Sequence, residues 1–160
     1  MSTVKTNAMR MLDSQEISYD VAEYEYDEKD LSGIHAAHAI GFEPEKVFKT
    51  LVARGDKTGI LVFCIPVNQE LDLKKAAVLS GNKKIEMIAV KELLGITGYI
   101  RGGCSPIGMK KKYPTYIDET AELFDVIAVS AGTRGKQIII SPLKLISFVS
   151  AEKADIVKDS

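Results

Sequence analysis

Two pairs of short apolar segments each predict a β-hairpin. Residues 46–54 (KVFKTLVAR) and 59–67 (GILVFCIPV) are rich in β-branched and aromatic side chains and flank the sequence GDKTG, which is typical of a hairpin loop. Residues 125–130 (DVIAVS) and 136–141 (KQIIIS) flank AGTRG in the same way. The alternating, Tyr-rich segment 18–26 (SYDVAEYEY) predicts a further strand with one face in water.

Other segments have apolar residues at helical spacing, next to residues that start or end a helix. Thr6 and Asn7 precede the first of them, Gly41 and Gly81 follow two others, and Pro142 opens the last. The predicted helices cover residues 8–15, 31–40, 72–80, 90–95 and 141–150.

The order of these elements predicts an α+β fold. Helices and strands interleave along the chain, but the clear strand pairs are hairpins rather than crossovers. We therefore expect a mixed, mainly antiparallel sheet packed with helices. The chain has 160 residues, of which 46% are hydrophobic, and no linker or repeat divides it. This length and composition predict a single domain over residues 1–160.

Charge narrows the range of functions. The net charge of −1 argues against a protein that coats nucleic acid, because tight sequence-independent binding needs many phosphate contacts. Residues 13–30 hold eight acids against one base, Lys29, whereas residues 101–112 hold Arg101 and Lys110–Lys112 and no acid. Both runs are typical of solvated surface, but the basic one could also hold one or two phosphates.

The cysteines and the apolar segments indicate the compartment in which the protein is located. Cys64 lies in an apolar run and Cys104 in a glycine-rich loop, which favours free thiols in a reducing compartment. The N-terminus lacks a long apolar stretch, and no segment approaches the roughly 20 apolar residues of a membrane helix. We expect a soluble cytoplasmic protein.

Most motifs that identify an enzyme class are missing. The sequence contains no P-loop, no GxSxG, no paired CxxC and no HExxH. His35 and His38 are the only histidines and lie three residues apart on a predicted helix, with no third ligand at metal-binding spacing. We predict surface positions for both, and no metal or cofactor.

Two features are candidates for binding or catalysis: Lys49 and the glycine-rich segment 98–114 (GYIRGGCSPIGMKKKYP). Backbone N–H groups in such a loop can face an anion or a developing oxyanion, but glycines also serve a tight connection between strands. Lys49 shares one strand face with Val47 and Leu51. It either extends its amine to water from an edge or is held in place for a purpose.

Four motifs in order give the chain a resemblance to a known family. They are KVFKTLV, LDLKK at 71–75, TGYIRGGCSPIG at 97–108 and SAGTRG at 130–135. Together they resemble the YbaK/EbsC family, free-standing relatives of the editing insertion in bacterial prolyl-tRNA synthetase. The resemblance extends from the first helix to the last.

The resemblance implies a fold, an activity and a site. The fold is a partly closed mixed sheet of about seven strands surrounded by helices, with a pocket for the tRNA 3′ end. The activity is hydrolysis of cysteine from mischarged proline tRNA, with prolyl-tRNA synthetase as a possible partner. The family's catalytic positions fall on Lys49 and Gly102, and its substrate-binding positions fall on Tyr24, Thr50, Gly103, Ser105, Pro106 and Gly135. Gln137 stands where relatives often carry an acid.

The implied mechanism uses the thiol of the substrate itself. A cysteinyl ester carries a strong nucleophile, so the protein need only orient it and stabilise the oxyanion with N–H groups near Gly102. Lys49 would hold the phosphate or ribose of the terminal adenosine. Three alternatives remain: a deacylase of another specificity such as Ala-tRNA(Pro), a non-catalytic tRNA- or nucleotide-binding module, and a thiol enzyme using Cys104. For Cys104, a small residue filling a tight loop is the better-supported reading.

Overall fold

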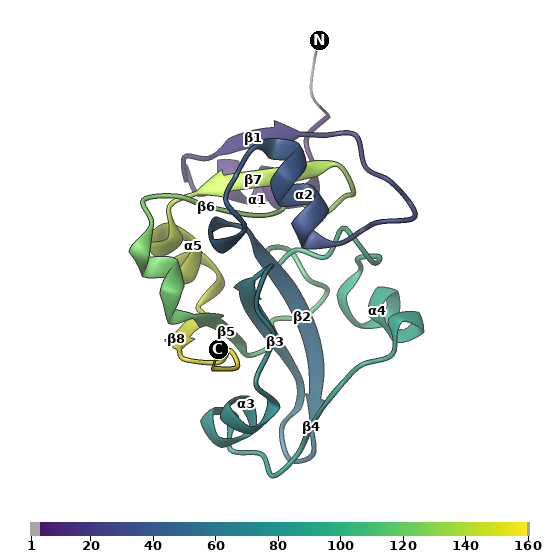
Figure 1. The fold of residues 1–160 in the computed structure, drawn as a ribbon, viewed down its shortest axis with the longest axis vertical. Coiled ribbons are helices and arrows are strands. Elements are labelled where there is room, and N and C mark those ends of the chain that lie inside the picture. Colours follow the sequence, from purple (N-terminus) through teal and green to yellow (C-terminus); the bar gives the residue numbers. More distant parts are fainter. Residues whose placement is uncertain (1–3, 160) are drawn as a thin grey trace.

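The computed structural model describes residues 4–159 as helices that surround two β-sheets (Figure 1). The helices are α1 Asn7–Ser14, α2 Gly33–Ile40, α3 Leu73–Ser80, α4 Val90–Thr97 and α5 Pro142–Val149, with short 3₁₀ turns η1 Pro44–Lys46 and η2 Glu119–Leu123. The strands are β1 Asp20–Glu23, β2 Phe48–Gly55, β3 Gly59–Pro66, β4 Ile85–Met87, β5 Thr115–Asp118, β6 Ile127–Ser130, β7 Lys136–Ile140 and β8 Glu152–Ala154.

The strands form one sheet of five in the order β4-β2-β3-β5-β8 and one of three in the order β1-β7-β6. A single bridge between Val47 and Ala128 links them. Four strand pairs are antiparallel, whereas β3–β5 and β5–β8 are parallel. The α+β class is confirmed. Instead of one sheet of about seven strands, the described residues form eight strands in two sheets.

The predicted helices begin and end where the sequence placed their signals. The Ser32 hydroxyl accepts a hydrogen bond from the N–H of His35 and caps α2. Gly41 ends the same helix with a φ of 74°, a left-handed conformation that costs glycine little. Both predicted hairpins, β2–β3 and β6–β7, are present. The segment 18–26 forms only the short strand β1.

The β2–β3 hairpin organises the molecule. It extends from the three-stranded sheet, beside which α2 lies, to α3 at the opposite end of the molecule (Figure 1). The largest cluster of buried apolar residues joins α1 and α5 to both sheets and includes Leu12, Phe48, Ile117, Ile138 and Leu145. Phe48, the first residue of β2, belongs to this cluster, whereas Val47 beside it packs with Ala37 of α2. The start of β2 therefore lies where the two sheets meet.

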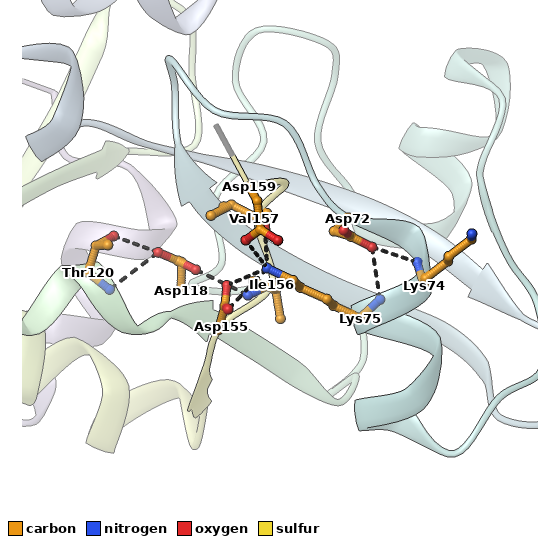
Figure 2. A network of polar contacts seen from close by, with 9 residues as sticks. All are labelled: Asp72, Lys74, Lys75, Asp118, Thr120, Asp155, Ile156, Val157 and Asp159. Carbon is orange, nitrogen blue, oxygen red and sulfur yellow. Dashed lines mark hydrogen bonds and ion pairs between the residues drawn. The ribbon is translucent and has the colours of Figure 1, made fainter.

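The LDLKK motif has a structural explanation at the far end of the molecule. Asp72 caps α3 by accepting the N–H groups of Lys74 and Lys75. The Lys75 amine donates to Asp155, Asp159 and the carbonyl of Val157, as Figure 2 shows. The hydrogen bonds to Asp159 and Asp155 raise the pKa of Lys75. The motif therefore ties the C-terminal segment to α3.

Candidate functional site

A cavity of about 460 Å³ opens where the two sheets and α2 meet. Its wall combines residues 29–34 and Ala36 around the start of α2, Val47 and residues 48–51 of β2, three residues of the glycine-rich loop (Arg101, Gly102 and Cys104), and Tyr24, Val67, Ser130 and Gln137. Of the predicted site residues, the structure brings Tyr24, Lys49, Thr50 and Gly102 together on this wall. The volume lies in the range of small-molecule sites.

Lys49 is half-buried on β2 and lines the cavity. The amine donates one hydrogen bond, 3.4 Å long, to the carbonyl of Val67. Burial lowers the pKa of Lys49, and the charge of Glu70 partly opposes this shift. No carboxylate of the described chain lies within ion-pair distance. Lys49 is therefore a cation whose remaining N–H groups can meet a ligand.

Gly102 is part of both a tight turn and the cavity wall. The N–H of Gly103 donates to the carbonyl of Ile100 at 3.0 Å, and Gly102 between them has a φ of 87°, as the third position of a type II turn requires. A Cβ on Gly102 would lie 3.2 Å from Leu31. The loop can therefore be both a tight connection and a binding loop, since the turn at Gly102 also forms part of the cavity wall.

Only some N–H groups of this loop can stabilise an oxyanion. The turn already uses the N–H of Gly103, whereas those of Gly102 and Cys104 donate to no other described residue. These two N–H groups carry partial positive charge and belong to residues that line the cavity.

The other predicted substrate-binding residues lie behind the wall rather than on it. Ser105 is fully buried and accepts the N–H of Ile107. Pro106 lines a separate hollow of about 300 Å³. Gly103 and Gly135 make close backbone approaches, and the Gly135 carbonyl accepts the N–H of Tyr24 at 2.9 Å. These four positions shape the loop and hold Tyr24 in place.

Of the basic run 101–112, Arg101 lines the cavity but the lysine triplet 110–112 does not. Lys111 and Lys112 line the 300 Å³ hollow, next to Met11 and Phe148. Arg101 and Lys29 are the surface cations that contribute to the wall of the 460 Å³ cavity. A phosphate near Lys49 would therefore meet Arg101 and Lys29 instead of the lysine triplet.

Two polar residues of the wall, Ser130 and Gln137, were not predicted to bind substrate. They are cross-strand partners on β6 and β7, and both are more than nine-tenths buried. A signal existed, because Ser130 ends an apolar strand and Gln137 directly precedes three isoleucines, in strands whose side chains alternate between two faces. The acidic stretch 13–30 is predicted as solvated surface, but one of its residues, Asp30, is part of the cavity wall.

Neither cysteine nor histidine forms a recognisable catalytic centre. Burial raises the pKa of both thiols, Cys64 and Cys104, to about 12, so neither is a thiolate near neutral pH. His38 is exposed on α2, while His35 is half-buried beside Tyr24, with ring centroids 6.4 Å apart. Between residues 4 and 159, no group of three His, Cys, Asp or Glu side chains could hold a metal ion.

Comparison with known proteins identifies the family. The profile of the aminoacyl-tRNA editing domain matches residues 31–148, a span that includes all of the cavity wall except Tyr24, Lys29 and Asp30. The chain therefore belongs to the aminoacyl-tRNA editing domain family. This confirms the predicted enzyme class, an aminoacyl-tRNA deacylase.

Individual relatives agree with this assignment. EbsC of Enterococcus faecalis, named as a candidate Cys-tRNA(Pro)/Cys-tRNA(Cys) deacylase, is 51% identical over 95% of this chain and 93% of its own length. A proline–tRNA ligase of Shouchella clausii is 32% identical over 62% of the chain, which corresponds to 17% of the ligase. A crystal structure described as that of a candidate trans-editing enzyme for prolyl-tRNA synthetase superposes with a TM-score of 0.83 at 25% identity, over 98% of this chain and 100% of its own.

No helix between residues 4 and 159 is long and apolar enough to cross a membrane. The helices have eight residues each, whereas a membrane-spanning helix needs about 20.

Proposed function

We propose that this protein removes cysteine from mischarged proline tRNA, acting in trans in the cytoplasm. The 51% identity to EbsC supports this substrate. The observation that carries the mechanism is a cavity that holds a cation and free N–H groups but no activated protein nucleophile. Such a site suits a substrate that brings its own nucleophile.

The proposed reaction begins when the sulfur of the cysteinyl ester attacks its own carbonyl carbon. A C–S bond forms, the carbonyl oxygen becomes an oxyanion, and the N–H groups of Gly102 and Cys104 stabilise it. The intermediate then expels the ribose oxygen, which takes up the proton lost by the thiol. The products are a cyclic thiolactone and free tRNA, and water later opens the thiolactone to cysteine.

In this mechanism the residues of the cavity orient the substrate. Lys49 binds the phosphate or ribose hydroxyls of the terminal adenosine by charge-assisted hydrogen bonds. Tyr24 and Thr50 confine the aminoacyl group. Confinement is effective because a correctly oriented intramolecular nucleophile has a high effective concentration.

We also propose that prolyl-tRNA synthetase presents the tRNA. The protein has a net charge of −1, and so few cationic contacts predict weak affinity for free tRNA. The partial match to a proline–tRNA ligase supports a functional link between the two proteins.

The test of the proposed function is deacylation of proline tRNA charged with cysteine, alanine or serine. We expect rapid loss of the cysteinyl ester and little loss of the other two, because a methyl group is no nucleophile and a hydroxyl is a weak one. Cleavage of the alanyl ester at a comparable rate would assign the protein to the Ala-tRNA(Pro) alternative. Binding without cleavage of any ester would indicate a binding module.

Serine substitutions at the two cysteines are expected to leave the activity intact. Cys104→Ser should retain near wild-type turnover, because its thiol is protonated and takes no part in the reaction. Cys64→Ser should also be active but lower the Tm by several degrees, since a buried hydroxyl in an apolar setting costs about 1–3 kcal/mol. Ester-release rates and thermal unfolding measure the two effects. A folded but inactive Cys104→Ser would support a thiol enzyme.

A further inference from the structure

The amide oxygen of Gln137 is a buried acceptor without a donor. Gln137 is only 6% exposed, lies on β7 and lines the cavity. Its Oε1 atom has no hydrogen-bond partner among residues 4–159. Buried polar atoms in folded proteins nearly always have a partner, so this unpaired oxygen requires an explanation.

The two cross-strand neighbours do not supply the donor. Ala22, the partner of Gln137 on β1, is apolar. Ser130, its partner on β6, accepts the N–H of Gly132 at 3.1 Å and makes no hydrogen bond with Gln137. Lys49 shares the cavity but directs its amine to Val67. No described residue therefore donates to this oxygen, and a donor has to come from a molecule in the cavity, either water or the ligand.

The chemistry of the substrate narrows the choice of donor. Phosphates and the ester carbonyl only accept hydrogen bonds, which leaves the α-amine, the reacting thiol and the ribose hydroxyls. The tRNA body stays outside a cavity of this size, so the amino acid at its tip enters furthest. A deeply buried acceptor therefore meets the aminoacyl group before it meets the ribose.

The carboxylate of the cavity wall is far more exposed to solvent than Gln137. Asp30 is the only acid that lines the cavity. Its side chain is 52% exposed. It already accepts the hydroxyl and the N–H of Ser32.

We propose that Gln137 recognises the free α-amino group of the aminoacyl ester. The inference rests on the proposed function and adds a specificity determinant to it. The Oε1 atom is closed to solvent in the free protein, but no hydrogen bond of the described chain fixes the amide. A rotation of the amide lets the oxygen accept one N–H of the amine and orient the Cα substituents before the thiol attacks. Because the amide is neutral, it provides this contact without burying an ion pair.

The experiment combines one variant with one altered substrate. Gln137→Met keeps the length of the side chain and removes the acceptor, while 3-mercaptopropionyl proline tRNA keeps the ester and thiol and lacks the amine. We expect Gln137→Met to lower kcat/KM for the cysteinyl ester about tenfold, the effect of one buried hydrogen bond. We expect it to leave kcat/KM for the amine-free ester unchanged.

Two further measurements separate recognition from a structural role. The Tm of Gln137→Met should equal or exceed that of the wild type, because the substitution breaks no hydrogen bond of the free protein. Gln15→Met, the same change outside the cavity at the end of α1, should leave both substrates unaffected.

Equal losses on both substrates would overturn the inference, since Gln137 would then contact the ribose or support the wall. An unchanged kcat/KM for the cysteinyl ester would also overturn it. A wild-type protein that cleaves neither substrate would refute the proposed function and the inference with it. The first two outcomes would refute the inference alone.

Discussion

Lys49→Ala is expected to reduce deacylation of Cys-tRNA(Pro) about a hundredfold while the protein remains folded. The side chain makes a single long hydrogen bond, to Val67, and is half-buried, so it contributes little to the free energy of unfolding. Its positive charge has no carboxylate partner in the described chain, and the residue lines the cavity. Charge-assisted hydrogen bonds contribute up to about 3 kcal/mol, which corresponds to this loss.

Two control variants make the result specific. Lys49→Met keeps the apolar stem and removes the charge, so it should be as inactive as the alanine variant with an even smaller change in Tm. Lys57→Ala removes an exposed lysine at the other end of the β2–β3 hairpin and should have no effect. Single-turnover rates and thermal unfolding suffice for all three. Near wild-type turnover by Lys49→Met would mean that Lys49 only extends its amine to solvent.

Local patterns predicted the long elements and failed on the short ones. The hairpins and the helices carry their own loop and cap signals, such as Ser32 and Gly41 around α2. Strands β4, β5 and β8 have only three or four residues, too few for alternation to show. Moreover, β5 pairs in parallel with β8, so that Tyr116 lies opposite Glu152. No short-range signal predicts such a contact.

The site was only partly predictable for a related reason. The strand pattern and the family resemblance located Lys49 and Gly102, but proximity in sequence misplaced the basic residues. Between Gly102 and Lys110 the chain passes through the interior at Ser105 and Ile107, both fully buried. The lysines therefore emerge on another surface. In contrast, the pairing of β7 with β6 and the packing of β6 against β2 bring Gln137 to the cavity, which only the tertiary structure shows.

The second large effect concerns the origin of the nucleophile. S-methyl-cysteinyl proline tRNA keeps the ester and the amine and nearly the same volume, but its sulfur cannot become a thiolate. We expect the protein to bind this substrate and to cleave it more than about a thousandfold more slowly than the cysteinyl ester. The buried thiols of Cys64 and Cys104, whose pKa values are about 12, cannot substitute for the missing nucleophile.

Steric exclusion predicts a much smaller effect, which makes the experiment decisive. One additional methylene in a pocket changes kcat/KM by about 10–200-fold, so a larger loss cannot come from size alone. Inhibition of cysteinyl-ester cleavage by the methylated tRNA would show that it still occupies the cavity, and its normal hydrolysis in alkali would show that the ester itself is intact. Turnover within the steric range would contradict attack by the substrate thiol. In that case the reaction would need water activated by a group of the cavity, and Lys49, whose pKa is lowered by burial, would be the first group to test as its base.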